Sequence, residues 1–456
     1  MKNRFLKLGF MAMMCAMLSV SCSSCGGDDD PSDDSKPKDE ASADQDKNPS
    51  DKPSDNPTDK PADTKKDIDD NVTAMSVAQQ MYPGWNLANT MEGSGNSVSA
   101  ETSWQKTPTS KELAQYIKAQ GFKSVRIPCN WYMHMSDAQT FTIDKAWMAR
   151  VTEVVDYFVN EGIYVMLNEH WDGGWLEELG YSTSNSSYSA VSDSYVKAKA
   201  DILHKLWTQI ANNFKDYDEH LLFAGQNEPF QNYNIFDKGL GNKKNTTLAP
   251  TLMKYNQTFV DAVRATGGNN AKRILVIQAP GISFDGALVD NFALSTDSRE
   301  NAMILEVHHY QPWDFAGGET GNILYWGAAN KDTKYYPSYL QDESSLQNDL
   351  KKLRNRYSDR GTPMIIGEYG ANWRDVSGKA DADQAKHDAS IKAFHKAVNQ
   401  LAPENGMVPM VWDINSLDRQ GLKGIMTIID RSGLKVFSEP AMEGIKEGAA
   451  AASWMK

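Results

Sequence analysis

The sequence predicts an α/β protein whose main domain is a (β/α)8 TIM barrel, a closed ring of parallel strands with helices on its outside. From residue 71 onward, short apolar runs alternate with longer segments whose apolar residues have helical spacing. Links from helix to strand are short, whereas links from strand to helix are long and aromatic, notably 171–193, 230–248 and 311–341. A doubly wound open sheet is the alternative fold, but it usually has fewer strands and a glycine-rich phosphate loop, which we do not find.

Residues 1–21, at the start of the chain, are predicted to be a targeting signal. Three basic residues precede the apolar run GFMAMMCAML, which is too short to span a membrane as a stable helix. Small residues ahead of Cys22 resemble the cleavage site of a bacterial lipoprotein, and lipid on Cys22 would anchor the chain rather than make it span. Cys25 is a second candidate for that lipid. The acidic run 28–30 resembles the surface-export signal of lipoproteins in Bacteroides-like bacteria. We therefore expect an outer-membrane lipoprotein exposed at the cell surface, or otherwise a periplasmic or secreted protein.

A tether is predicted for residues 22–70, which consist almost wholly of Asp, Lys, Ser, Pro, Ala and Asn and contain no aromatic residue. Such a segment cannot bury enough apolar surface to offset its ordering entropy, so we expect disorder. It carries much of the formal net charge of -13. No basic patch stands out in the chain, and nucleic-acid binding is therefore not expected. Three of the four cysteines lie in the first 25 residues, so the folded part has no disulfide framework.

The barrel itself is predicted from residue 71 to residue 456. Its candidate strands are 83–88, 123–129, 164–170, 221–227, 273–279, 302–310, 363–370 and 407–414. Helical patterns lie between them, such as 110–121 and 143–162. Thr109 and Glu112 have capping-box spacing at the start of the first. The long links all follow strands, which places them on the face that carries the active site in barrels of this type.

Two of these strands end on a glutamate. Glu228 follows the run LLFAGQN, and Glu368 follows PMIIG, in the fourth and seventh strands by order. A buried carboxylate is costly unless its charge is paired or its pKa is shifted for use. Glycosidic bond hydrolysis needs two carboxylates across a cleft, one to protonate the leaving oxygen and one to attack the anomeric carbon. A purely structural alternative is that Glu228 caps the next segment, and Asp172 and Asp413 on the same face are alternative sugar ligands.

Residues 75–450 resemble a glycoside hydrolase of family five, the large family of endo-β-1,4-glucanases and their relatives. The resemblance is carried by ordered motifs at the predicted strand ends: GWNLANT (84–90), SVRIP (124–128), LNEHWDGGW (167–175), QNEP (226–229), VHHY (307–310), IIGEYG (365–370) and VWD (411–413). It implies a retaining double displacement with Glu228 as general acid/base and Glu368 as nucleophile. It also implies substrate-binding or supporting roles for Arg126, His170, Asn227, His308, Tyr310, Trp412, Asn86, Trp131, Trp171 and Trp313.

Elementary physics agrees with those roles. Arg126 near Glu368 would favour its ionised form, and a hydrogen bond from Tyr310 could orient it. Asn227 would reach the hydroxyl next to the anomeric carbon, and Trp412 would form an apolar platform under the sugar. Each residue also has a structural alternative, since aromatic residues usually pack in cores and Arg126 could form only a core ion pair.

The expected substrate is a polysaccharide, most simply cellulose-like β-1,4-glucan, with xyloglucan, mixed-linkage glucan and β-mannan as alternatives. A non-catalytic surface glycan-binding protein is the competing class. We expect no cofactor and no metal because the chemistry is complete without one, although His170, Asp172 and His308 are an alternative metal-ligand set. We expect a monomer that meets the membrane only through its lipid anchor.

Overall fold

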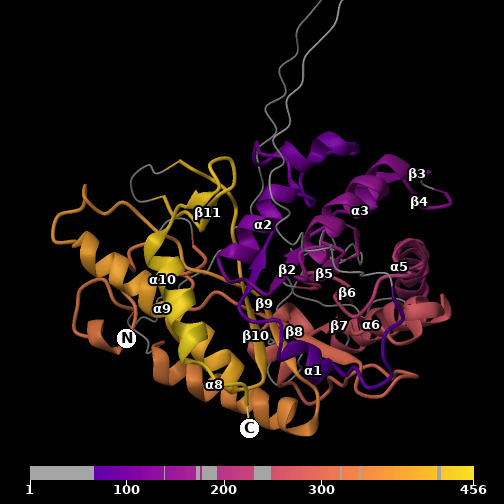
Figure 1. Cartoon of the computed structure of the whole chain (residues 1–456). Coiled ribbons are helices and arrows are strands. Elements are labelled where there is room, and N and C mark those ends of the chain that lie inside the picture. Colours follow the sequence, from indigo (N-terminus) through magenta and orange to yellow (C-terminus); the bar gives the residue numbers. More distant parts are fainter. Residues whose placement is uncertain are drawn as a thin grey trace, which may run out of the picture. The chain divides into compact units, whose positions relative to one another are not determined.

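Eight parallel strands close into a barrel in the order β1-β2-β5-β6-β7-β8-β9-β10 (Figure 1). The computed structural model describes residues 66–455 except 138, 171–174, 177–192, 231–247, 319–320, 338–340 and 419–422. The barrel strands are β1 (Gly84–Asn86), β2 (Ser124–Ile127), β5 (Tyr164–Asn168), β6 (Leu221–Ala224), β7 (Leu275–Gln278), β8 (Met303–His309), β9 (Met364–Tyr369) and β10 (Met407–Val411). Each lies within one of the predicted ranges, so the predicted (β/α)8 barrel is confirmed.

Helices surround the strands (Figure 1). They are α2 (Lys111–Ala119), α3 (Lys145–Val159), α5 (Asp193–Asn213), α6 (Leu248–Ala265), α7 (Phe284–Ala287), α8 (Glu343–Arg356), α9 (Gln384–Glu404) and α10 (Glu439–Ala451). Two antiparallel hairpins pair β3 (Met135–Asp137) with β4 (Thr142–Ile143) and β11 (Ile429–Asp430) with β12 (Lys435–Val436). In the described part of the chain, no helix combines the length and apolar content needed to cross a bilayer.

The start of α2 differs from the predicted capping box. Ser110, in an extended conformation, is the N-cap, and its side chain accepts a hydrogen bond from the backbone N–H of Leu113. The backbone N–H of Thr109 instead donates to Glu101 at 2.7 Å. A tertiary contact therefore holds Thr109 outside the helix, and the next hydroxyl residue along the chain performs the capping.

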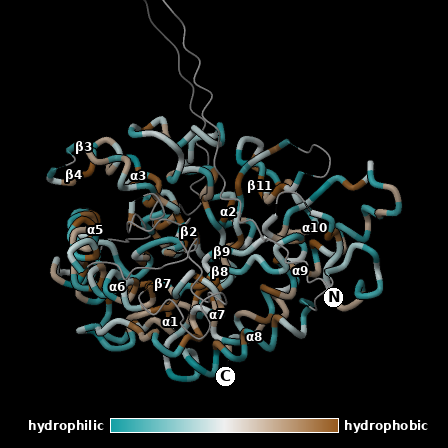
Figure 2. The backbone as a smooth tube through the Cα atoms, turned by 180° about the vertical axis from the view of Figure 1, so that it is seen from behind, coloured by the Kyte–Doolittle hydropathy of each residue, from teal (hydrophilic) through white to brown (hydrophobic). Residues whose placement is uncertain are grey.

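Strand alternation divides the core into an outer and an inner layer. Val125 and Ile127 pack in the cluster between strands and helices, so Arg126 between them points into the barrel. The inner cluster contains Met166, Val276 and Ile304, against which the short helix α1 (Ala74–Ala78) packs. Apolar segments are concentrated in the central strands and hydrophilic ones in the outer loops (Figure 2). Polar side chains are thus left for the other, C-terminal end of the barrel interior.

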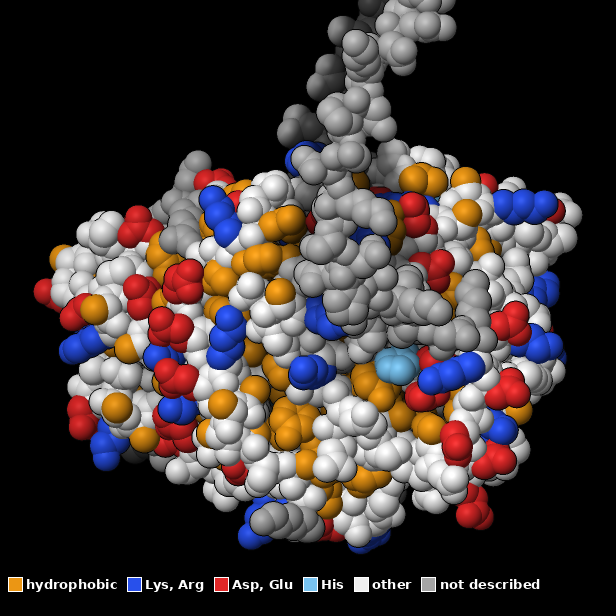
Figure 3. All heavy atoms as spheres, in the orientation of Figure 1, with side chains coloured by type: hydrophobic (Ala, Val, Ile, Leu, Met, Phe, Trp, Pro, Cys, Tyr) orange, Lys and Arg blue, Asp and Glu red, His pale blue; other side chains and the backbone are white. Residues whose placement is uncertain are grey.

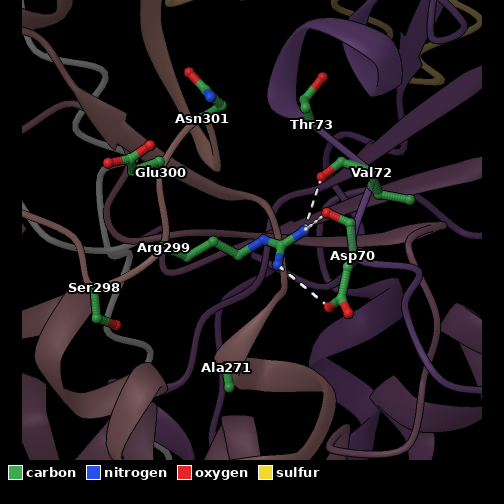
Figure 4. A pocket seen from close by; sticks show the side chains of 8 residues that line it. All are labelled: Asp70, Val72, Thr73, Ala271, Ser298, Arg299, Glu300 and Asn301. Atoms are coloured by element: carbon green, nitrogen blue, oxygen red, sulfur yellow. Dashed lines mark hydrogen bonds and ion pairs between the residues drawn. The ribbon is translucent and has the colours of Figure 1, made fainter.

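The chain joins the barrel earlier than predicted. Ile68 is buried, its N–H donates to the Asn269 side chain at 2.9 Å, and its carbonyl accepts from Lys272 Nζ at 3.1 Å. Arg299 donates to the carbonyl oxygens of Asp70 and Val72, each at 3.0 Å, and lines a surface pocket of about 460 Å³ with them (Figure 4). The folded unit therefore includes residues 66–70, which the sequence assigned to the tether. The rest of the predicted tether and the targeting signal lie outside the described residues.

Charged side chains of both signs are mixed over the surface. On the face shown in Figure 3, Lys and Arg side chains lie among Asp and Glu side chains. Several form ion pairs along or between helices, such as Lys392 with Glu443 and Glu447 at 2.9 and 2.7 Å. The exposed pairs contribute little to stability, so the barrel depends on its apolar layers.

Candidate active site

Strand register brings polar residues together at the C-terminal end of the barrel. Asn86 on β1 is the register partner of Arg126 on β2, and His308 on β8 is the partner of Glu368 on β9. Glu228 follows β6, four residues beyond its last strand residue, Ala224. Residues as far apart in the chain as Asn86 and Glu368 therefore meet in one place, because parallel strands all finish on the same face.

Glu228 and Glu368 face each other across His308. One carboxylate oxygen of each lies within 4.8 Å of the other. His308 Nδ1 lies 2.8 Å from Glu228 Oε1 and 3.6 Å from Glu368 Oε2. The Glu228 side chain is 19% exposed and that of Glu368 is 7% exposed. Glu228 is therefore the more accessible of two carboxylates that are close enough to act on one bond.

Both oxygens of Glu368 are held by donors. Arg126 Nη1 donates to Oε1 at 2.8 Å, and the Tyr310 hydroxyl donates to Oε2 at 3.0 Å. Burial raises the pKa of the Glu368 carboxyl, while the positive charges of His308 and Arg126 and the Tyr310 hydroxyl oppose that rise. The contacts that the sequence predicted for Arg126 and Tyr310 are present in the structure, and they fix the carboxylate in one orientation.

Arg126 links most of the site. Besides Glu368, its Nη1 donates to Asn86 Oδ1 at 3.2 Å, and its Nη2 donates to Asn227 Oδ1 at 2.7 Å. Asn86 in turn donates to the carbonyl oxygens of Gly367, Met410 and Val411 at 2.9–3.2 Å. Asn86 is fully buried, so it supports the strand ends and Arg126 rather than contacting substrate.

His170, which follows β5, and Trp412, which follows β10, lie side by side. Their ring centroids are 5.9 Å apart, with an interplanar angle of 11°. Burial lowers the pKa of His170 well below its usual range, and the charges of Arg126 and His308 act in the same direction. A neutral imidazole beside a half-buried indole can present hydrogen-bonding and apolar surfaces to a sugar ring.

The other tryptophans predicted for the site differ in their burial. Trp131 is fully buried and its indole N–H donates to the Asn168 carbonyl at 2.9 Å, so it supports the end of β5 and cannot stack on a sugar. Trp313 is 48% exposed in the loop after β8. Its ring lies over Gly317, where an added Cβ would come within 2.4 Å of the ring carbons. Trp171 lies outside the described residues.

Of the two alternative sugar ligands, Asp172 and Asp413, the structure describes only Asp413. Asp413 is fully buried and accepts from the Trp85 indole at 2.9 Å and from the Ile429 backbone N–H at 3.0 Å. The alternative role of Asp413 as a sugar ligand does not fit the structure, since its side chain is fully buried and accepts these hydrogen bonds. The alternative metal set of His170, Asp172 and His308 stays a hypothesis, because Asp172 lies outside the described residues.

Among the described residues, the ligand atoms of Glu228, His308 and Glu368 are close enough to one another to bind a metal ion. Two positive groups disfavour a cation there. Arg126 is ion-paired with Glu368, and burial opposes the charged form of His308, but the surrounding carboxylates outweigh it and raise its pKa to about 9. The donor set therefore fits proton transfer better than metal binding.

Sequence reasoning missed one buried acid in this site, Glu306 on β8. It is fully buried, and its Oε1 lies 3.0 Å from Arg126 Nε and 3.3 Å from His308 Nε2. The signal that could have found it is strand alternation, because Glu306, His308 and Tyr310 are spaced two residues apart and therefore share the inner face.

Comparisons with known proteins agree with this site. The family model described as cellulase (glycosyl hydrolase family 5) matches residues 88–418. Endoglucanase A of Paenibacillus barcinonensis is 34% identical over 362 residues, covering 75% of this chain and 83% of that protein. A xyloglucan-specific endo-β-1,4-glucanase of Bacteroides ovatus is 34% identical over 357 residues, covering 75% of this chain and 65% of that protein.

A similar solved structure is that of a xyloglucan-specific β-1,4-glucanase from a ruminal metagenomic library, in complex with the oligosaccharide XXLG. It is 46% identical, with a TM-score of 0.75, and the match covers 84% of this chain and 97% of that one. The range matched by the family model includes Arg126, Glu228 and Glu368.

Proposed function

The chain belongs to the cellulase family, glycosyl hydrolase family 5, and on that premise we propose that it cleaves the β-1,4-linked backbone of a glucan internally and with retention of configuration. It is a glycoside hydrolase of the endoglucanase type, and its substrate class is a polysaccharide. The observation that carries the proposal is the separation of Glu228 and Glu368. One oxygen of each carboxylate lies within 4.8 Å of the other, which is consistent with carboxyl groups roughly 5–5.5 Å apart, as in retaining enzymes.

In the first step, Glu368 attacks the anomeric carbon and forms a glycosyl ester. At the same time the Glu228 carboxyl gives its proton to the glycosidic oxygen, and the leaving chain departs as a neutral alcohol. Arg126 and Tyr310 hold the two oxygens of Glu368 in place for this attack. The attacking group is thus preorganised before substrate arrives.

In the second step, Glu228 acts as a base. It removes a proton from a water molecule, which attacks the same carbon, and the ester oxygen leaves as the Glu368 carboxylate. Asn227, held by Arg126, would donate its amide to the hydroxyl next to the anomeric carbon. His170 and Trp412 would contact the sugar at the cleavage point, and Trp313 a sugar on the side of the β8 loop.

Xyloglucan is the first candidate among the β-1,4-glucans. The support is the 46% identity to the metagenomic xyloglucan-specific β-1,4-glucanase, together with the Bacteroides ovatus relative of the same stated specificity. Unsubstituted cellulose-like glucan, mixed-linkage glucan and β-mannan are the alternatives. A non-catalytic glycan-binding role is disfavoured, because a binder has no need for two buried, oriented carboxylates.

The test is an assay of the purified mature chain against xyloglucan, carboxymethylcellulose, mixed-linkage β-glucan and β-mannan. A fast fall in viscosity with few new reducing ends indicates internal cleavage, and proton NMR of the first products should show the β anomer. Glu368→Gln is the matched control and should be inactive on every polymer. The α anomer as first product, or no hydrolysis of any polymer, would contradict the proposal.

We also propose that the protein is held at the outer membrane, facing outward, by lipid on Cys22, and that it works as a monomer. The support is the sequence of the first 30 residues: a basic start, a short apolar run, small residues before the cysteine and an acidic run behind it. A soluble polymer outside the cell would then reach a barrel held at the cell surface by its lipid anchor.

A further inference from the structure

A third glutamate lies beneath the two proposed catalytic carboxylates. Glu306 has no exposed surface, and burial of an unpaired carboxylate there would be strongly unfavourable. It is compensated on both oxygens. Oε1 is ion-paired with Arg126 Nε at 3.0 Å and accepts from His308 Nε2 at 3.3 Å, and Oε2 accepts from Gln278 Nε2 at 2.7 Å. Burial opposes ionisation of Glu306, but these partners outweigh it and lower its pKa.

The surrounding strands are shaped around this carboxylate. Gly367, directly before Glu368, leaves the space it occupies, since an added Cβ would sit 1.9 Å from Glu306 Oε1. Gln278 is the register partner of Glu306 on the neighbouring strand. The Gln278 side-chain oxygen also accepts from the backbone N–H of Gln226 at 3.0 Å. Glu306 is therefore connected through Gln278 to the segment that carries Glu228.

The contact with Glu306 fixes which ring nitrogen of His308 faces the two proposed catalytic carboxylates. Because Nε2 donates to Glu306, the nitrogen that faces Glu228 and Glu368 is Nδ1. A single proton can then lie between Nδ1 and Glu228 Oε1, which are 2.8 Å apart. The ionisable groups that interact with His308 are Glu228 after β6, Glu306 on its own strand, Glu368 on β9 and His170 after β5. Arg126 on β2 and Tyr310 contact the same carboxylates.

We propose that Glu306 is a positioning residue for the hydrolysis: it fixes His308 so that Nδ1 shares one proton with Glu228, and it holds Arg126 beneath Glu368. This inference rests on the proposed function of the two carboxylates. Glu306 itself contacts no substrate, since it is fully buried. It acts through the two cations that it pairs with.

A pH dependence follows from the sign of the charge on Glu306. Its negative charge favours retention of the proton shared by His308 and Glu228, which the first step needs. The carboxylates around His308 raise the pKa of His308 to about 9. Glu306→Gln removes one of those charges and keeps the shape, so the shared proton is lost at lower pH. The basic limb of kcat/KM should move down by about 1 pH unit.

The test compares pH profiles of the wild-type mature chain and Glu306→Gln on a polymer that the wild type hydrolyses. We expect kcat to fall roughly tenfold or more with a smaller change in KM, because no substrate contact is removed. Glu306→Asp keeps the charge, so its basic limb should stay near that of the wild type even if kcat falls. Asp297→Asn is the matched control: it removes a carboxylate paired with Arg264 at 2.6 Å, in the segment that leads into β8 at the N-terminal side of the barrel. It should leave the pH profile unchanged.

A basic limb in Glu306→Gln that coincides with the wild-type limb would overturn the inference and leave the proposed function intact. Absence of β-glucan hydrolysis by the wild type would instead overturn the proposed function. If Glu306→Gln does not fold, nitrogen NMR of histidine-labelled wild type decides, with the His308 signals assigned by their loss in His308→Gln. We expect Nε2 of His308 to carry hydrogen throughout pH 6–9, and an unprotonated Nε2 at neutral pH would overturn the role of Glu306.

Discussion

Replacing Glu228 by alanine separates the two chemical steps. A positioned general acid contributes roughly 10²–10⁴-fold to rate, which corresponds to about 3–5.5 kcal/mol of transition-state stabilisation. The polymer's leaving group is an alkoxide without that proton, so Glu228→Ala should lose this factor on polysaccharide. A substrate with a dinitrophenyl leaving group needs no proton. Its first step should proceed at close to the wild-type rate, because Arg126 and Tyr310 still hold Glu368.

The second step should then stall, since no base activates the water. The alanine leaves space beside His308, whose Nδ1 lay 2.8 Å from the lost carboxylate, and a small anion can enter there. Added azide should restore turnover of the dinitrophenyl substrate and give a β-glycosyl azide, because azide replaces the glycosyl ester from the face that water would use. The assay is a stopped-flow burst of dinitrophenolate followed by NMR of the azide product.

The matched variant is Glu368→Ala, which should show no burst with any substrate, since no glycosyl ester can form. An α-glycosyl azide from Glu228→Ala would mean direct displacement and would reverse the two roles. A burst in Glu368→Ala of wild-type size would refute the assignment altogether.

Further predictions concern the fold, the metal, the anchor and the cleft. A protein beginning at residue 71, or Ile68→Ala, should lose about 2–4 kcal/mol of unfolding free energy in urea, because Ile68 is buried; a protein beginning at residue 61 should match the full mature chain. Activity should survive extended dialysis against EDTA; loss that one divalent ion restores, with metal content measured, would instead support a metal site. Cys22→Ala should move the protein from the membrane to the soluble fraction, and retention of lipid would point to Cys25. Trp313→Ala should raise KM for polymer roughly 2–10-fold with unchanged melting temperature, as expected for loss of one stacking face on an exposed ring.

The strands and the acidic pair could be predicted from the sequence because both depend on local signals. Buried parallel strands are short apolar runs, and a glutamate that ends such a run has few structural explanations. Chain order then identified Glu228 and Glu368 as belonging to the fourth and seventh barrel strands, as the sheet order has them.

What could not be predicted depends on long-range packing. Trp131 and Trp313 both follow strands in aromatic segments, yet one is fully buried and the other is 48% exposed. The sequence cannot say which ring another segment covers. Ile68 looked like a lone apolar residue in a polar tether, and only its distant partner Asn269 shows that it belongs to the barrel.

Glu306 also could not be predicted, and its charge sets the net charge of the site. Three carboxylates, Glu228, Glu306 and Glu368, meet two cations, Arg126 and His308, in a largely buried cluster. With all five ionised the net charge is -1, and the proton on His308 Nδ1, shared with Glu228, is the one that the proposed first step delivers. After delivery Glu368 is an uncharged ester, Glu228 is ionised and His308 is neutral, so the net charge is still -1. In the second step the pair of Glu228 and His308 takes up a proton from water as Glu368 regains its charge, and the net charge is again -1. Without Glu306, one of the three negative charges that retain the shared proton would be missing, so that proton would be lost at lower pH.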